Sequence, residues 1–415
     1  MTKILFVLMV SCFLFPVISA QDAITDEGWR EDIETLVTTI LRVHPDPFRT
    51  ISEADFTASV DALLEEVPDL SDNEIFVRMM RIVASIQDGH SGMYASGQEG
   101  FPIHFYPLRF YVFADGIYVV EASDDYAEFV GARLVSVDGI PADEVYEILR
   151  LSAAGDNPST QIITTGIQIN VPEILQGAGI MEAEPNYEFE LPDGEIRTLN
   201  PVALELDELN ENFPEYILPQ TGNIPYLNNA DETLWYEVLE DSRTFYVVYN
   251  MVRTRSRSGL TVRNVAEEIE AHLESDSIDR VIIDLRNNPG GNEGTSLPLS
   301  VFLINNEFFD EDGRLIVLTG PRTFSAAVVF SLRLEAGTSA VFIGEDTGGR
   351  PLMFENNSLL ILQNSDIRLR IASRAREDVP AEDTRLAISP DILIPLRAED
   401  YFAGLDPAFD AALGY

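Results

Sequence analysis

Three turns in the last part of the chain hold the residues whose types and spacing could perform chemistry. Each follows an apolar run expected to be a buried strand, and they comprise residues 284–292, 319–327 and 344–350. In the second turn, Ser325 begins a predicted helix and is flanked by small residues. A hydroxyl so placed is exposed at a sheet edge, where helix N-terminal N–H groups can stabilise an oxyanion. Ser325 is therefore a candidate nucleophile.

The other two turns are rich in glycine. Gly290 and Gly291 follow Asn-Pro and would expose backbone N–H groups in a turn that only glycine enters easily. Residues 344–350 could close over a bound chain. Singly, these features have structural interpretations, with Ser325 as a helix N-cap and the glycine pair as a tight turn. Their order along the chain favours a catalytic site.

The elements that must position these turns begin with a helical block. Apolar residues recur at helical spacing in residues 25–43, 52–66 and 71–86, and Ser71 opens a capping box. The third helix should end before residues 87–92, which contain His90. We predict a small helical cap that ends in this loop.

A strand-like period follows from Phe101. Residues 110–113 and 117–120 predict a hairpin with a two-residue turn. The run GARLVSVDGIPADEV, residues 131–145, resembles the strand, turn and helix of a PDZ-like peptide-binding domain. A β-rich linker domain without a ligand is the alternative interpretation.

Strands and helices alternate after an acidic connection at residues 201–231. The runs 281–285 and 315–319 are continuously apolar, as expected of strands buried on both faces. This alternation predicts an α/β core that binds ligands at the carboxyl ends of its strands. The three turns follow such strand ends.

Composition excludes several classes of protein. The chain of 415 residues has 27 basic and 70 acidic side chains, a formal net charge of −43. Such a charge repels a phosphate backbone and disfavours an anionic membrane surface, so no nucleic-acid partner is expected. With 46% hydrophobic residues and a mean hydropathy of +0.02, the chain can fill real cores.

The first twenty residues predict a secretory signal peptide. A basic start at Lys3 precedes an apolar run of about 15 residues, which is short for a membrane span, and Ala20 precedes the expected cleavage site. An uncleaved anchor and a lipid-anchored Cys12 are the alternatives. Cleavage would remove the sole lysine and the sole cysteine and leave a charge of −44. We expect an exported protein, periplasmic or extracellular, without disulfides.

Together the turns resemble the tail-specific, or C-terminal processing, peptidase family, which includes the tricorn core and interphotoreceptor retinoid-binding protein. The carrying motifs are DLRNNPGG at residues 284–291, TFSAA at 323–327 and GEDTGG at 344–349. Two motifs near the C-terminus, SPDI at 389–392 and YFAGLDP at 401–407, add to the resemblance. It implies a serine peptidase with no metal and no cofactor, acting on protein or peptide substrates.

The resemblance offers two kinds of base, and composition chooses between them. The lysine used by one branch would fall at Arg350, whose guanidinium cannot accept a proton, and the mature chain has no lysine. The tricorn-like branch uses a histidine from the cap, and Asp-Gly-His-Ser matches that element at His90. His104 is the rival. Activity is then expected to decline below about pH 6.5, where an ordinary imidazole is protonated.

The remaining site residues are implied by the resemblance alone. An acid shortly before Pro390 would orient His90, and Asp383 is favoured slightly over Glu382. The oxyanion hole would use the N–H groups of Gly291 or Gly290 and of Ala326. Several relatives have a glutamate where this chain has Val328, and in the lysine-dependent branch that glutamate supports the lysine, so its absence here fits a histidine base.

We thus predict an α/β multidomain protein, an exported serine endopeptidase that works through an acyl-enzyme. Its expected parts are a signal peptide (1–20), a helical N-terminal cap (21–98), a PDZ-like β-rich domain (99–210) and a crotonase-like αβα protease core (211–415). The alternatives are an inactive protein that binds peptides or small apolar ligands and an acyl-ester hydrolase. The sequence does not indicate the oligomeric state.

Overall fold

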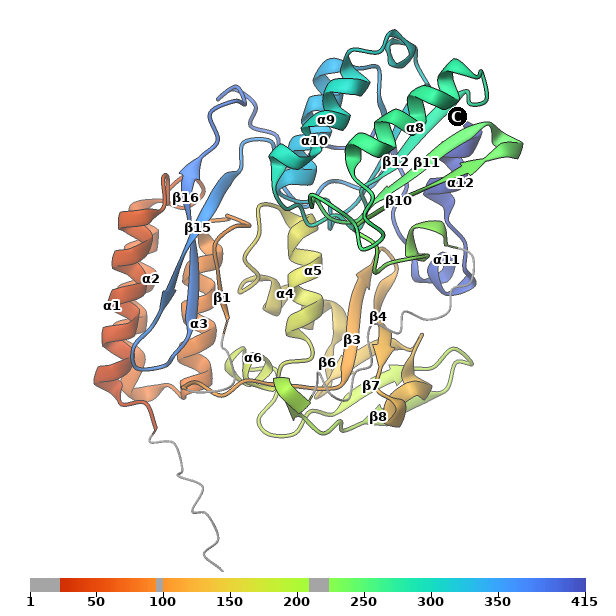
Figure 1. Ribbon diagram of the computed structural model, residues 1–415. Coiled ribbons are helices and arrows are strands. Elements are labelled where there is room, and N and C mark those ends of the chain that lie inside the picture. Colours follow the sequence, from red (N-terminus) through yellow and green to blue (C-terminus); the bar gives the residue numbers. More distant parts are fainter. Residues whose placement is uncertain (1–22, 95–99, 209–223) are drawn as a thin grey trace, which may run out of the picture.

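The computed structural model describes residues 23–94, 100–208 and 224–415 (Figure 1). Helices and several sheets form a mixed α/β architecture, as predicted. The predicted signal peptide lies outside the described residues. Within these ranges no helix combines the length and apolar character that a membrane span requires.

A layer of helices opens the described chain. Its elements are α1 (Asp26–Val43), α2 (Glu53–Glu66) and α3 (Asp72–Ser85). The hydroxyls of Thr25, Ser52 and Ser71 cap the three N-termini. Ser71 and Glu74 form the predicted capping box. The helix ends therefore follow the local signals in the sequence.

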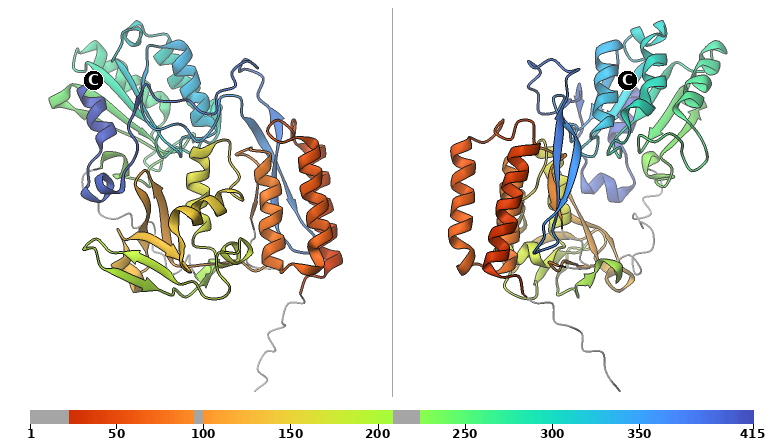
Figure 2. Two further views of the ribbon diagram at one scale, coloured as in Figure 1. Left: turned by 180° about the vertical axis from the view of Figure 1, so that it is seen from behind. Right: turned by 60° about the vertical axis from the view of Figure 1, so that its left-hand side comes forward.

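A hairpin from late in the chain completes this layer. The sheet has the order β1-β16-β15, with β1 (Gly92–Tyr94), β15 (Phe354–Ile361) and β16 (Arg368–Ala375). Leu369 and Ile371 share a core with Trp29 and Ile33, and Figure 2 shows the hairpin beside the helices. At the hairpin turn, the Asp32 carboxylate accepts hydrogen bonds from Ser365. Residues 211–415 were expected to form the core. This hairpin belongs to that segment, but it packs against the helical layer.

A second unit, here the β3–β8 unit, follows in the chain. Its sheet runs β3-β4-β5-β7-β8, and β6 pairs with β5. The elements are β3 (Leu108–Phe113), β4 (Gly116–Ala122), β5 (Arg133–Val137), β6 (Ile140–Pro141), α4 (Ala142–Arg150), α5 (Pro158–Gln168), α6 (Pro172–Gly177), β7 (Tyr187–Glu190) and β8 (Ile196–Leu199). The predicted hairpin is β3 and β4, and α5 packs on β3. Nearby, β2 (His104–Phe105) pairs with β9 (Leu204–Glu205).

The third unit, here the core, has a sheet of order β10-β11-β12-β13-β14-β17, parallel except for β10. Its strands are β10 (Leu234–Leu239), β11 (Thr244–Tyr249), β12 (Arg280–Asp284), β13 (Leu315–Thr319), β14 (Val341–Gly344) and β17 (Ile392–Leu393). Its helices are α8 (Val262–Glu274), α9 (Glu293–Ile304), α10 (Ala326–Gly337), α11 (Ala398–Ala403) and α12 (Pro407–Gly414).

Alternating side chains of the central strands explain why this sheet is covered on both faces. Phe245 and Val247 pack with α8, α9 and α10, whereas Tyr246 and Val248 pack with α11 and α12 (Figure 1). All of β11 is buried. The three turns singled out in the sequence follow β12, β13 and β14, at one edge of this sheet.

Candidate active site

Ser325 lies between β13 and α10 with a strained backbone. Its φ of +50° and ψ of −121° are unusual for a residue with a Cβ, at a cost of about 1–3 kcal/mol. Its side chain makes no capping hydrogen bond to the helix that it precedes. Ser325 is therefore not a side-chain N-cap, and the conformation directs its hydroxyl elsewhere.

The Ser325 hydroxyl meets His90 of the helical layer. His90 Nε2 lies 2.9 Å from Ser325 Oγ, across 235 residues of sequence. The imidazole stacks on Phe324 with ring centres 4.7 Å apart. Gly89 permits this approach, because a Cβ on it would come within 2.7 Å of the Phe324 ring. The structure thus brings together the predicted nucleophile and the predicted base.

A buried group of charged and polar side chains packs against the His90 loop and forms hydrogen bonds with it. Asp88 accepts hydrogen bonds from Ser91 Oγ and from the His90 N–H, and His44 Nε2 lies 3.3 Å from its Oδ2. Burial alone would raise the pKa of Asp88, but these hydrogen bonds outweigh it and hold the pKa below its ordinary value. Ser91 Oγ also accepts a hydrogen bond from the Ala372 N–H of β16.

Asp156, which the sequence analysis did not single out, is the second carboxylate of this buried group. It is fully buried and accepts a 2.9 Å hydrogen bond from the Gly89 N–H. Burial and the nearby charge of Asp88 raise the pKa of Asp156 above its ordinary value. Its place after Gly155 and before the α5 N-terminus is an ordinary loop signal, so only the fold reveals it.

Arg350 fills the place where the resemblance would put a lysine. Its side chain is buried, donates from Nη2 to the backbone carbonyl of Asp156 and has Nε 4.0 Å from an Asp156 carboxylate oxygen. Arg350 thus helps to hold the Asp156 loop. It contacts Asp156, whose carboxylate holds the His90 loop. Within the described part of the chain, Arg350 makes no hydrogen bond to Ser325.

The glycine turn lies against Ser325, as its place after β12 predicts. Gly290 has a φ of +100°, and a Cβ there would come within 2.7 Å of Ser325 Cβ and 2.8 Å of Ala326 N. The Gly290 N–H donates to Asn288 Oδ1. No hydrogen bond from the N–H of Gly291 or Ala326 is found among the described residues. These two N–H groups remain available to a ligand.

The acids predicted to orient His90 lie in other surroundings. Asp383 accepts two hydrogen bonds from the Arg385 guanidinium, which also pairs with Glu335. The hydrogen bonds from Arg385 lower the pKa of Asp383. Glu382 is exposed. No hydrogen bond links either acid to His90, whose Nδ1 is buried without a partner among the described side chains.

The rival histidine is engaged elsewhere. His104 Nδ1 lies 2.6 Å from Glu173 Oε1, and the His104 N–H donates to Glu173 Oε2. His272 lies 2.7 Å from Ser277 Oγ at the end of α8. In the portions that the structure describes, no group of three or more His, Cys, Asp and Glu side chains has a metal-binding arrangement.

The chain is similar to known proteases in sequence and in fold. No family model matches the chain. The chain is 22% identical over 325 residues to the carboxyl-terminal-processing protease of Picosynechococcus sp., which covers 68% of this chain and 76% of that protein. The fold is similar to that of mature CPAF bound to lactacystin, with a TM-score of 0.64 and 13% identity over 94% of this chain and 97% of that one. A second mature CPAF structure gives a TM-score of 0.62 at 14% identity, over 94% and 96% of the two chains.

The chain thus resembles a carboxyl-terminal-processing protease in sequence and mature CPAF in fold. The resemblance stated from the motifs is thereby confirmed.

Proposed function

We propose that this protein is an exported serine-type endopeptidase that uses Ser325 as nucleophile and His90 as base. The observation that carries the proposal is the 2.9 Å contact between His90 Nε2 and Ser325 Oγ. Strain at Ser325 and burial of the supporting carboxylates are costs that a purely structural loop would not require. The similarity to a carboxyl-terminal-processing protease supports peptide bonds as the substrate.

The reaction follows from the positions of the groups. Neutral His90 takes the Ser325 proton at Nε2 as Oγ attacks the peptide carbonyl carbon, and the carbonyl oxygen becomes an oxyanion. Protonated His90 then gives that proton to the departing amine, leaving an acyl-enzyme. Water, deprotonated by His90, attacks the ester, and the imidazolium returns the proton to Ser325 as the acid product leaves.

We assign the oxyanion hole to the N–H groups of Gly291 and Ala326. Both are free of hydrogen bonds within the described residues, whereas the Gly290 N–H is occupied by Asn288. Preorganised backbone donors of this kind stabilise developing negative charge without reorganising during the reaction. Gly290 would then serve by its small size, since a side chain there would strike Ser325.

For the group that orients His90, the contacts favour Asp156 over the predicted Asp383 and Glu382. Asp156 accepts a hydrogen bond from the N–H of Gly89, the residue before His90, whereas Asp383 is engaged by Arg385. We propose Asp156 as a positioning residue that acts through the loop. Asp383 stays the alternative, and parallel Asp156→Asn and Asp383→Asn variants distinguish them.

The finer domain assignments belong to the same proposal. The β3–β8 unit, with its strand–turn–helix at residues 131–145, is proposed to be PDZ-like, and the core to be crotonase-like. Export rests on the predicted signal peptide at residues 1–20. Cell fractionation with an antibody, together with the N-terminal sequence of the mature chain, tests it.

Labelling with a fluorophosphonate tests the proposal directly. We expect the wild-type protein to react at Ser325, with the label lost in Ser325→Ala and strongly reduced in His90→Ala. His104→Ala is the matched control and should label normally, because His104 pairs with Glu173. Failure of the wild-type protein to label above the Ser325→Ala background would favour the inactive binding protein.

A further inference from the structure

A large cavity lies beside the candidate active site, between the β3–β8 unit and the core. It has a volume of about 830 Å³. Aromatic and aliphatic side chains of β3 and α5 form one wall, among them Phe110, Tyr111 and Ile163. Pro289 and Arg322, from the turns of the core that carry Gly290 and Ser325, also line the cavity. A substrate chain in this cavity would therefore lie against the two turns that carry Gly290 and Ser325.

The cavity is lined by seven arginines and by six carboxylates, which are Glu121, Asp231, Glu232, Glu345, Asp400 and Asp406. Four of the seven form ion pairs: Arg109 with Glu121, Arg257 with Asp231, Arg286 with Asp284 and Asp406, and Arg397 with Asp115. The other three, Arg253, Arg255 and Arg322, are exposed and have no carboxylate within ion-pair distance in the described ranges. In so acidic a chain, three guanidinium groups that have no carboxylate partner among the described residues and line one cavity indicate an anionic ligand.

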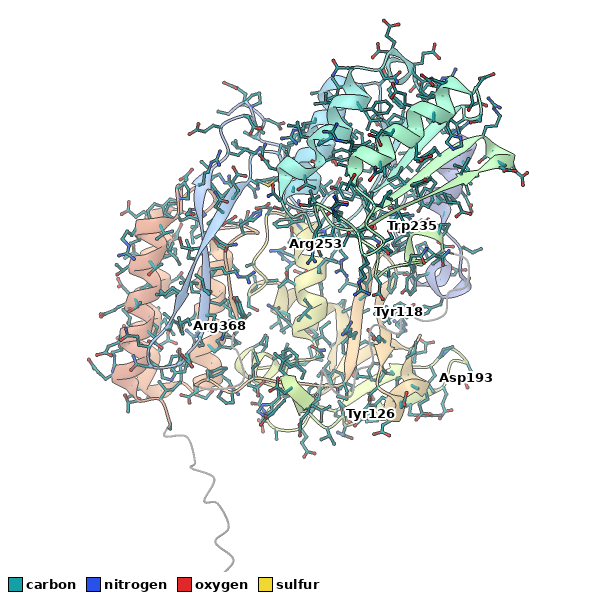
Figure 3. The ribbon with its side chains drawn as sticks, viewed as in Figure 1. Tyr118, Tyr126, Asp193, Trp235, Arg253 and Arg368 are labelled. Carbon is teal, nitrogen blue, oxygen red and sulfur yellow. The ribbon has the colours of Figure 1, made fainter. Side chains whose placement is uncertain are left out.

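These three residues, here the arginine cluster, are tied closely to the catalytic turns. Val252 forms two backbone hydrogen bonds with the glycine turn. Its N–H donates to the Gly290 carbonyl oxygen at 2.8 Å, and its own carbonyl oxygen accepts from the Asn292 N–H at 3.0 Å. Arg253 and Arg255 follow directly, and Arg253 lies near the upper end of α5 in Figure 3. Arg322 comes three residues before Ser325.

We propose that the arginine cluster binds side-chain carboxylates of the substrate, so that the enzyme prefers peptides with Asp or Glu near the scissile bond. This inference rests on the proposed peptidase function. Guanidinium groups bind carboxylates through paired N–H donors, and the apolar wall suits the stems of such side chains. The attraction acts at short range, where it offsets the long-range repulsion by the acidic surface.

Binding to the Ser325→Ala protein tests the preference without requiring turnover. The probes are two fluorescent peptides, C-terminally amidated and alike except that one carries Glu where the other carries Gln. By fluorescence anisotropy at moderate salt, we expect the Glu peptide to bind about five- to tenfold more tightly. Adding Arg253→Gln, Arg255→Gln and Arg322→Gln should reduce the ratio to below about twofold.

The matched control is Arg263→Gln, an exposed arginine on α8 outside the cavity, which should keep the full preference. Thermal unfolding checks that the triple variant is folded. Equal binding of the two peptides, or a preference that survives in the folded triple variant, would overturn the inference. A third probe is the Gln peptide with a free C-terminal carboxylate, and the inference would also be overturned if this probe bound as tightly as the amidated Glu peptide.

A parallel cleavage assay separates the two proposals. If the wild-type protein cleaves both peptides at equal rates and binds them equally, the peptidase proposal stands and the substrate preference is wrong. If the Glu peptide binds selectively but no peptide is cleaved, the peptidase proposal is wrong and the cavity remains a site for acidic peptides.

Discussion

The two sides of the candidate site are built in different ways. Ser325 and the glycine turn belong to one unit, and each follows directly from a buried strand of the core. His90 comes from a loop of the helical layer and is supported by Asp88, Asp156 and a backbone contact to β16. The nucleophile thus depends on local backbone conformation, whereas the base depends on contacts between segments far apart in sequence.

This difference predicts how each side responds to change. Local conformation at Ser325 stores strain, so replacing the residue should alter stability as well as activity. The buried carboxylates that hold the His90 loop, Asp88 and Asp156, have pKa values shifted in opposite directions, so the stability of this side should depend on pH. Four substitutions test this contrast.

The largest effect is expected for Ser325→Gly. Loss of the nucleophile should lower kcat/KM by at least about 10⁴-fold. Because glycine adopts a positive φ at little cost, the variant should also be more stable than Ser325→Ala, by about 1 kcal/mol. Peptide hydrolysis and denaturant unfolding measure the two effects. Equal stability of the two variants would argue against strain at this position.

His90→Ala should lower kcat/KM by about 10³- to 10⁴-fold. In the wild-type protein the rate should fall in acid, because protonated imidazole cannot accept the Ser325 proton. The residual activity of the variant should lack this acid limb. The pH dependence of kcat/KM measures both, and a wild-type rate that is constant down to pH 4 would remove His90 from the role of base.

Asp156→Asn should lower kcat by about ten- to hundredfold through loss of alignment at the Gly89 loop. The substitution should also change how the stability of the protein depends on pH. The raised pKa of Asp156 means that the folded state disfavours the carboxylate, so ionisation should reduce wild-type stability as pH rises above the ordinary Asp value of about 3.9.

The Asp156→Asn variant cannot ionise at this position and should escape that decline. The difference in unfolding free energy between variant and wild type should therefore move in favour of the variant between pH 4 and neutrality. Thermal unfolding across this range measures it. A difference that is constant with pH would contradict the assigned environment of Asp156.

The smallest effect is expected for Asp383→Asn. Asp383 and Arg385 form a partly exposed ion pair, so its loss should change kcat/KM by less than about threefold and stability by at most about 1 kcal/mol. Steady-state kinetics beside Asp156→Asn decides between the two acids. A hundredfold loss confined to Asp383→Asn would restore the acid that the sequence resemblance favours.

Much of the fold follows from local patterns. The capping box at Ser71, the hairpin at residues 110–120 and the apolar runs that became β12 and β13 are encoded within short segments. The path of residues 354–375 was not predicted, because a hairpin does not specify its packing partner locally. Its buried residues Leu369 and Ile371 pack against α1, which lies more than three hundred residues earlier in the sequence.

For the site itself, residue types in the sequence determined the candidates. A serine at a strand-to-helix turn, a glycine pair after the preceding strand and the absence of lysine beyond Lys3 led to Ser325, Gly291 and a histidine base. Short-range rules of backbone conformation and the chemistry of single side chains suffice for these.

Only the tertiary structure decided which groups meet. It placed His90 on Ser325, engaged His104 with Glu173 and Asp383 with Arg385, and buried Asp156 beneath the His90 loop. It also placed the arginine cluster in the cavity beside the turns, without a carboxylate partner among the described residues. Burial and charge pairing depend on distances between segments that are remote in sequence, and these distances exist only once the chain has folded.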